Sequence, residues 1–214
     1  MTSENLFPKT RAVLAALGRL GFEFQESTLL DRAGEFRRLC STWNLSAKLM
    51  SPTDLSERFD DHVADSLSLA PYLRDGAAPP TALVDVGAGA GFPGIPLCLL
   101  APTLQTFEIE RSETKATFLR QALSRLMIDQ AKVLQENFPQ VSLPDMTLVY
   151  TARAVESPAD VDRAIIKRLK PGDSYLVQRQ VPELSGNQTA TVEKLEDEFS
   201  KSGLRRGVLY RIRR

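Results

Sequence analysis

Apolar residues recur at intervals of three and four along the first part of the chain, which is the spacing of an amphipathic helix. The pattern predicts helices over residues 8–20, 28–42 and 54–72, and it places Asp54 where it would cap the third of them. Residues 1–78 are therefore expected to form a helical N-terminal extension packed on the rest of the protein.

From Thr81 onward, short apolar runs alternate with helical patterns, which predicts a mostly parallel sheet covered by helices on both faces. Helices are expected near 94–101, at 113–127, at 158–169 and near 190–202, and the second of these carries one apolar face. The strands follow the runs TALVDV, TFEIE, AKVLQ, TLVYTA, SYLVQ and GVLYRIR, and the apolar face consists of Ala116, Leu119, Leu123, Leu126 and Met127. Residues 79–214 would form this α/β domain, with 182–189 as a mobile loop.

Composition narrows the class of protein. The 214 residues include 27 basic and 27 acidic side chains, so any contact with nucleic acid has to come from local patches. Cys40 and Cys98 lie far apart without a pairing or metal-ligand pattern, which favours a reduced, cytoplasmic protein without a metal site. The N-terminal apolar stretch is too short and too charged for a signal peptide or a membrane span. We expect a monomer that does not bind membranes.

The most informative stretch is LVDVGAGAGFPGIP, residues 83–96, in which glycines follow directly on an apolar strand. Gly87, Gly89 and Gly91 would let the backbone approach a ligand, and the helix that follows would point N–H groups at it. Pro93 suits the first turn of that helix. A tight turn without a ligand needs one glycine rather than three alternating ones, so we interpret the stretch as a binding loop.

Two cofactors fit this loop. Residues 89–94 match the dinucleotide pattern G-x-G-x-x-G, and Glu110 lies where an acid would hold a ribose hydroxyl, so a nicotinamide dehydrogenase is one hypothesis. However, the glycines that adjoin the strand are Gly87 and Gly89, so this register starts two residues late. Asp85 in the strand would repel a pyrophosphate and suits a cofactor with cationic groups. These observations favour S-adenosylmethionine, with Glu110 on its ribose.

Several further pieces of sequence carry a resemblance to a known family. They are WNLSA (43–47), the His-x-x-Asp-Ser core of 57–73 at His62, Asp65 and Ser66, the glycine loop at 84–97, IERSETKATFLRQ (109–121), ARA (152–154) and LKPGD (169–173). With these, the chain resembles the RsmG (GidB) family of bacterial small-subunit ribosomal RNA guanine-N7 methyltransferases. The resemblance implies a class I methyltransferase (Rossmann-like) fold with a seven-stranded sheet, S-adenosylmethionine as donor, and a guanine in the 530 loop of 16S ribosomal RNA as acceptor.

The resemblance also implies roles for individual residues. It places Phe92 beside the cofactor, Asn137 and Phe138 at the adenine, and Arg153 near both donor and acceptor. His62 is implied as a functional residue, although a histidine on a helix face is by itself more often structural. Arg153 would likewise be a solvated loop charge if the resemblance did not extend to it.

The acceptor chemistry agrees with what the chain lacks. Guanine N7 has a lone pair and no proton, so in-line methyl transfer needs positioning and no general base. Neither cysteine has the setting of a nucleophile for pyrimidine C5, and YTARAVESP replaces the Asn/Asp-Pro-Pro-aromatic loop typical of exocyclic-amine methylation. Gln178 and Arg179 depart from the family's usual sequence. A methyltransferase acting on another RNA or a small molecule, or a silent ribosome-associated cofactor binder, therefore remain as alternatives.

Two groups of basic residues are candidates for RNA contacts. One group lies on or beside the predicted helix 113–127, and the other crowds the C-terminal segment. They are Arg111, Lys115, Arg120 and Arg125, and Arg205, Arg206, Arg211, Arg213 and Arg214. We expect the second group to hold phosphates, which would give affinity without sequence choice. The alternative for that group is a charged edge strand protected from pairing.

Overall fold

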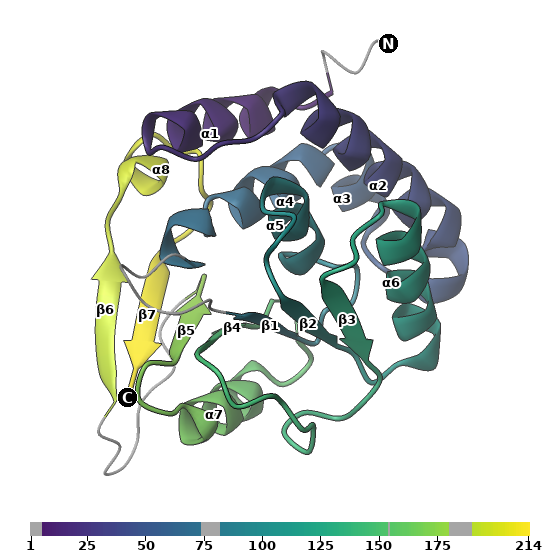
Figure 1. The fold of residues 1–214 in the computed structure, drawn as a ribbon. Coiled ribbons are helices and arrows are strands. Elements are labelled where there is room, and N and C mark those ends of the chain that lie inside the picture. The colour runs from purple at the N-terminus through teal and green to yellow at the C-terminus, as the bar shows by residue number, and fades with distance from the viewer. Residues whose placement is uncertain (1–5, 74–81, 154, 180–189) are drawn as a thin grey trace.

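The computed structural model describes residues 6–73, 82–153, 155–179 and 190–214. The predicted mobile loop 182–189 therefore lies outside the described residues. The N-terminal part is helical, as predicted, and its helices lie on one face of the sheet, where they pack mainly on helices of the part that follows (Figure 1). They are α1 (Pro8–Arg19), α2 (Glu26–Ala47), α3 (Pro52–Ser56), α4 (Phe59–Leu67) and the 3-10 helix η2 (Ala70–Leu73).

The predicted helix 54–72 is wrong as one element, because it consists of α3, α4 and η2. Ser51, rather than Asp54, is the N-cap of α3: its hydroxyl accepts the backbone N–H of Asp54 at 3.0 Å. Pro52 then occupies the first turn, where its missing N–H costs nothing. The helical pattern is interrupted again before Pro71, because a proline cannot continue α4. The capping serine and the prolines outweigh the apolar spacing.

One seven-stranded sheet forms the centre of the protein, in the order β3-β2-β1-β4-β5-β7-β6. The first five strands along the chain are parallel, while β7 is antiparallel to β5 and to β6. The strand order reverses between β1 and β4, which is where open α/β sheets bind ligands. The strands are β1 (Ala82–Val86), β2 (Thr106–Ile109), β3 (Ala131–Leu134), β4 (Leu148–Thr151), β5 (Ser174–Val177), β6 (Thr191–Leu195) and β7 (Leu209–Arg213).

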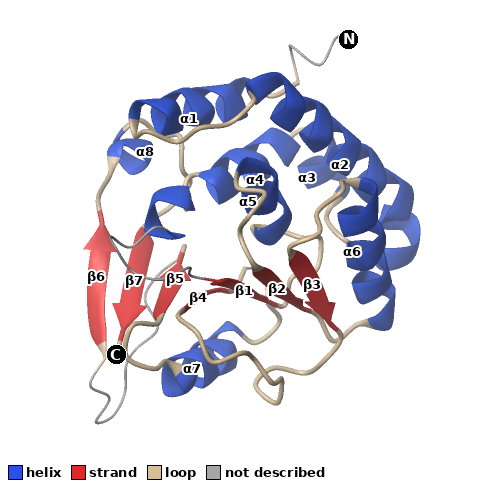
Figure 2. Cartoon of the chain, in the orientation of Figure 1, coloured by secondary structure: helices blue, strands red, loops and turns tan. Residues whose placement is uncertain are grey.

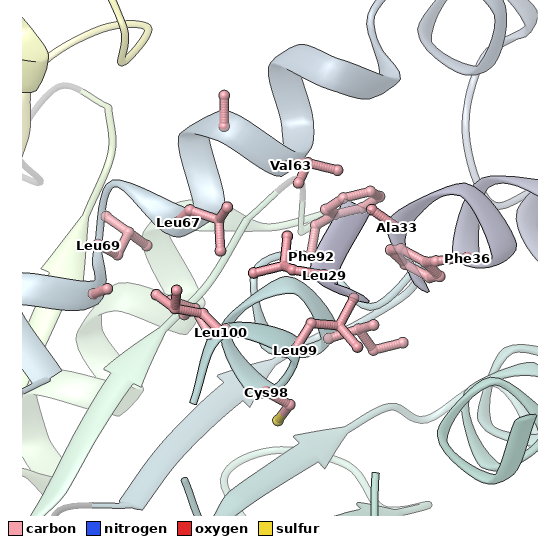
Figure 3. Packing of buried hydrophobic residues seen from close by; sticks show 14 of the residues in the cluster. Leu29, Ala33, Phe36, Val63, Leu67, Leu69, Phe92, Cys98, Leu99 and Leu100 are labelled. Atoms are coloured by element: carbon pink, nitrogen blue, oxygen red, sulfur yellow. The ribbon is translucent and has the colours of Figure 1, made fainter. Parts of the chain in front are cut away.

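Helices cover both faces of the sheet, but unequally (Figure 2). α5 (Gly94–Leu100) and α6 (Glu113–Arg125) pack on one face together with the N-terminal helices, and α7 (Pro158–Arg168) lies on the other. The larger hydrophobic core lies on the first face, where α2 and α4 meet α5 around Phe36 and Phe92 (Figure 3). The N-terminal helices therefore bury the residues that follow the glycine loop.

The predicted helix near 190–202 is wrong over its first half. Residues 191–195 form β6, an edge strand whose Glu193 pairs with Arg211 of β7 at 2.7 Å. The short helix α8 (Glu198–Lys201) begins only after Asp197, which accepts the N–H of Ser200 in a capping box. The Asp197 and Ser200 pair in the sequence could have indicated that the helix starts at about residue 198 rather than 190.

The predicted apolar face of α6 is confirmed in part. Ala116, Leu119, Leu123 and Leu126 are buried, but Met127 is 73% exposed. The helix ends at Arg125, and Met127 has a positive φ of 49° that turns its side chain away from the core.

Candidate active site

The glycine-rich turn joins β1 to α5 at the switch point of the sheet. Gly87, Gly89 and Gly91 all have positive φ, at 71°, 55° and 83°, a region that other residues rarely adopt. Gly91 is additionally required by packing, because a Cβ there would lie 2.9 Å from Cγ1 of Ile95. A Cβ at Gly87 would likewise lie 2.7 Å from Cγ1 of Val155, so the alternating glycines reflect backbone conformation at three positions and close packing at two.

A cavity of about 370 Å³ opens beside this turn, a size typical of sites for small molecules. It brings together most of the residues predicted for the site, from the loops after β1 to β4 and from α4. The predicted residues that line it are His62, Gly87, Gly89, Phe92, Glu110, Asn137, Phe138 and Arg153. Asp85 and Gly91 do not line the cavity and lie behind its wall.

Other lining residues were not predicted from the sequence. Leu49, Met50 and Asp54 come from the segment between α2 and α4, and Lys115 comes from the first turn of α6. Leu49 and Met50 lie between two predicted helices, and Asp54 was predicted only as a helix cap. The sequence gives no sign that this segment lies next to the loops after the strands, because that contact depends on the tertiary fold.

Glu110 follows β2 and fixes the glycine turn from one side. Its carboxylate accepts the backbone N–H of Gly89 at 3.0 Å and that of Ser112 at 2.7 Å. Ser112 in turn is the N-cap of α6. The predicted ribose-binding acid is thus oriented by two backbone donors at the rim of the cavity.

Two carboxyl groups lie buried under the glycine turn. Asp85 of β1 and Glu108 of β2 are register partners on neighbouring parallel strands, and both are 0% exposed. Asp85 accepts the N–H of Gly94 at 3.1 Å and the hydroxyl of Thr151 at 3.3 Å. Within the described part of the chain, no donor group reaches either carboxyl oxygen of Glu108. Glu108 was not among the predicted site residues, although an acid in the middle of the apolar strand TFEIE could have indicated a functional position.

Burial controls the protonation of this pair. It raises the pKa of Asp85 to about 7, against which the Gly94 N–H and the Arg153 charge lower it. Burial and then the charge of Asp85 raise the pKa of Glu108 well above its ordinary value. Glu108 is therefore the protonated member of the pair at neutral pH.

This pair predicts a pH dependence of stability. Because both pKa values are higher in the folded than in the unfolded protein, the pair's contribution is fully present below about pH 4 and is lost as pH rises through about 7. Glu108→Gln removes one titration and keeps a donor for Asp85. We expect the variant's free energy of unfolding, relative to wild type, to increase from about pH 5 to about pH 8 in urea denaturation. A difference that does not vary with pH would contradict the assignment.

His62, the single histidine, stands between an acid and two arginines on the wall of the cavity. Its Nε2 lies 3.2 Å from Oδ1 of Asp54, and its Nδ1 lies 3.2 Å from Arg206 and 3.4 Å from Arg153. Since a guanidinium only donates, Nδ1 accepts and Nε2–H donates to Asp54. Burial and then the Arg153 charge lower the pKa of His62, so the ring is neutral at neutral pH. Both ring nitrogens are thus engaged.

Arg153 follows β4 and reaches across to α4. Its guanidinium donates to the hydroxyl of Ser66 at 3.2 Å and lies 3.8 Å from the carboxylate of Asp65. Burial lowers the pKa of Arg153, while Asp65 and Asp85 favour its charged form. The His-x-x-Asp-Ser sequence therefore places three side chains of one helix around this arginine.

Three of the five C-terminal arginines form ion pairs within the protein. Arg205 is buried and pairs with Asp197 at 2.8 Å, and Arg211 pairs with Glu193. Arg206 pairs with Asp65 through its Nε at 2.6 Å. The side-chain amide of Gln178, which departs from the family sequence, supports this segment by donating to the carbonyl of Arg206. These arginines hold β7 and its approach against α4 and β6.

The sequence profile of the family described as GidB, rRNA small subunit methyltransferase G, matches residues 30–205. The chain belongs to this family. Among its relatives, the Ribosomal RNA small subunit methyltransferase G of Xanthomonas axonopodis pv. citri is 34% identical over 139 residues, which is 65% of this chain and 63% of that protein. The protein of the same description from Coxiella burnetii is 29% identical over 170 residues, 79% and 80% of the two chains. The first match thus covers less than two thirds of its relative.

Solved structures confirm the fold expected of a GidB family member. A mutant of MtNAS in complex with S-adenosylmethionine has a TM-score of 0.54 at 14% identity, with 96% of this chain and 76% of that chain covered. Human methyltransferase 10 domain containing protein has a TM-score of 0.50 at 14% identity, with 84% and 95% covered. The class I, Rossmann-like methyltransferase fold predicted from the sequence is therefore confirmed, including its seven strands.

Membership in a methyltransferase family also confirms the choice of S-adenosylmethionine over a nicotinamide cofactor. The residues present fit this group, because Gly87 and Gly89 bring the backbone to the wall of the cavity and Glu110 places an acid at its rim. In the part of the chain that the structure describes, no helix is long and apolar enough to cross a membrane.

Proposed function

We propose that this protein transfers the methyl group of S-adenosylmethionine to N7 of a guanine in the 530 loop of 16S ribosomal RNA. The proposal rests on its family and on one observation within the site, the engagement of both ring nitrogens of His62. A histidine in this state is not free to accept a proton, and guanine N7 has none to give. We place the reaction in the cytoplasm, with the small ribosomal subunit or its RNA as partner of a monomeric enzyme.

The donor side of the cavity would hold the cofactor through the loops after β1, β2 and β3. Gly87 and Gly89 would approach its methionine part, Glu110 would accept from the ribose hydroxyls, and Asn137 with Phe138 would contact the adenine. Asp85 and Gly91 would act from behind by fixing the turn. When bound, the cofactor supplies an electrophilic methyl on a cationic sulfur.

The acceptor side would be formed by Arg153, His62 and Phe92. Arg153 keeps N–H groups beyond those directed at Ser66 and His62, and these can donate to guanine O6. Adenine presents an amino donor at the same place, so the same arginine would disfavour it. Phe92 is 8% exposed and packs 5.4 Å from the ring of His62, which keeps that ring in place. The chain's residues would thus orient the two partners and move no proton.

The reaction product tests this function. Incubating 16S ribosomal RNA, as free RNA and within small subunits, with the protein and labelled S-adenosylmethionine should yield 7-methylguanosine at one guanine of the 530 loop. Reduction followed by aniline should cleave the RNA there, because the methylated ring is cationic. Label recovered as N6-methyladenine or a C5-methylpyrimidine would overturn the acceptor assignment. Donor binding without any methylated RNA would indicate a silent cofactor binder.

A further inference from the structure

A second concave surface lies between α2 and α6, and we call it the α2–α6 groove. Its volume is about 280 Å³, and its lining contains two arginines, one tryptophan, one amide, one hydroxyl and one leucine, but no acid. The residues are Arg38, Leu39, Thr42, Trp43, Gln121 and Arg125. Neither the cofactor nor the acceptor guanine of the proposed reaction uses them.

The groove leads away from the mouth of the active site. α2 and α6 run antiparallel, because Arg32 near the start of α2 donates to the carbonyl of Leu126 while Trp43 near its end contacts Gln121. Past Trp43, the same chain reaches Leu49 on the wall of the active-site cavity. On α6, Lys115 lines that cavity and Gln121 lines the groove, a separation of roughly 9 Å along the helix.

Trp43 is held in a fixed orientation within the groove. Its indole N–H donates to the side-chain carbonyl of Gln121 at 2.6 Å, and its ring packs 6.1 Å from that of Phe118. The side chain is only partly buried, so part of the ring faces the groove. A fixed aromatic surface of this kind stacks with nucleobases, each contact contributing about 1–3 kcal/mol.

The two arginines give the groove a positive charge. Arg38 is 67% exposed and pairs with Glu35 on the same helix, an exposed ion pair that is worth little and leaves the cation available to a phosphate. Arg125 is exposed at the end of α6. By contrast, Arg205 and Arg206 are committed to internal carboxylates. An aromatic ring beside two accessible guanidinium groups suits a base with its phosphates.

We propose that the α2–α6 groove binds a single-stranded segment of the RNA substrate next to the nucleotide held in the active site. The inference rests on the proposed function for the identity of the RNA. Trp43 stacks with one base, and Arg38 and Arg125 contact phosphates next to it. The groove thereby adds affinity for unpaired RNA outside the reaction centre and leaves the chemistry to Arg153 and its neighbours.

Trp43 is the single tryptophan of the chain, so its fluorescence reports directly on this groove. We expect a 530-loop fragment of 16S ribosomal RNA to quench this emission in protein saturated with S-adenosylhomocysteine. The double variant Arg38→Gln with Arg125→Gln should bind the fragment at least tenfold more weakly. Its binding should lose about 0.7 units of salt slope for each phosphate contact removed. Arg163→Gln, an equally exposed arginine on α7 paired with Asp160, is the matched control and should bind like wild type.

The outcomes separate this proposal from the proposed function. RNA that is bound or methylated without quenching Trp43 would overturn the groove assignment alone, as would unchanged affinity in the double variant. Quenching that appears with assembled subunits but not with bound RNA fragment would also overturn it, in favour of a protein contact. Quenching that depends on the two arginines, without 7-methylguanosine in the product, would support the groove and overturn the acceptor. If wild type binds no RNA, both proposals fail.

Discussion

Gly94→Ala is expected to lower the free energy of unfolding by about 2–3 kcal/mol, since it forces atoms into a filled part of the core. A Cβ at this position would lie 2.6 Å from Cδ of the buried Glu108 carboxyl and closer still to its Oε1. The shift needed to relieve this overlap would also break the hydrogen bond from Gly94 N–H to Asp85, which anchors the start of α5. We therefore expect weaker binding of S-adenosylmethionine as well. Urea denaturation and calorimetry measure the two effects.

Two other glycines provide controls for this substitution. Gly18 in α1 and Gly34 in α2 have open space where a Cβ would stand, with nothing within 4 Å, so alanine there should stabilise the protein by about 0.5–1 kcal/mol through helix propensity. Adding Glu108→Ala to Gly94→Ala should recover part of the loss, giving a coupling between the two sites. Equal stability of Gly94→Ala and wild type would contradict the packing described for Glu108.

Arg153→Ala is expected to lower the rate of methyl transfer by more than tenfold while the affinity for S-adenosylmethionine changes little. The arginine lies on the proposed acceptor side of the cavity, fixed by Ser66 and close to Asp65, so its loss would remove donors for the acceptor and not for the cofactor. Arg153→Lys keeps the charge without the planar fork and should recover only part of the rate. Single-turnover kinetics measures the rate of methyl transfer, and calorimetry measures the affinity for S-adenosylmethionine.

Arg111→Ala is the matched control for this experiment. Arg111 also lines the cavity, but it is 61% exposed and pairs with Glu156 at the rim. We expect its removal to change the transfer rate by no more than about twofold, since exposed ion pairs contribute little. A similar loss in both variants would show that general charge at the cavity mouth, and not the placement of Arg153, determines the rate.

The parts of the fold predicted correctly are those that local sequence determines. Four of the five parallel strands are buried, and β3 at the edge is partly exposed. Each appears as a short, mainly apolar run between helices, and the prediction locates all five. β6 was missed because it is an edge strand whose outward residues are polar, and TVEKL also suits a helix. Its strand conformation depends on pairing with β7, a partner that no local pattern reveals.

The site residues likewise fall into those that a local sequence pattern predicts and those that depend on contacts between distant parts of the chain. Gly87, Gly89 and Glu110 were predicted because a strand followed by glycines and then a second strand ending in an acid is a local sequence pattern. The role of Glu108 depends on its register with Asp85, and that of Arg206 on an ion pair with a residue of α4. Basic composition at the C-terminal segment indicated RNA, whereas in the structure three of these arginines form ion pairs with acids of the same chain.

The contact between Arg206 and Asp65 sets an order in which the two sides of the site can be completed. Gly89 and Glu110, which shape the donor side, are 21 residues apart, whereas the backbone bond from Arg206 to Asp65 joins residues 141 apart. Contacts between nearby residues form with a smaller loss of chain entropy than contacts between distant ones. We therefore expect the proposed donor side to form early in folding, whereas His62 gains all its neighbours only once the segment before β7 is in place. Damage confined to that segment should then leave a protein that holds its donor beside an incomplete acceptor side.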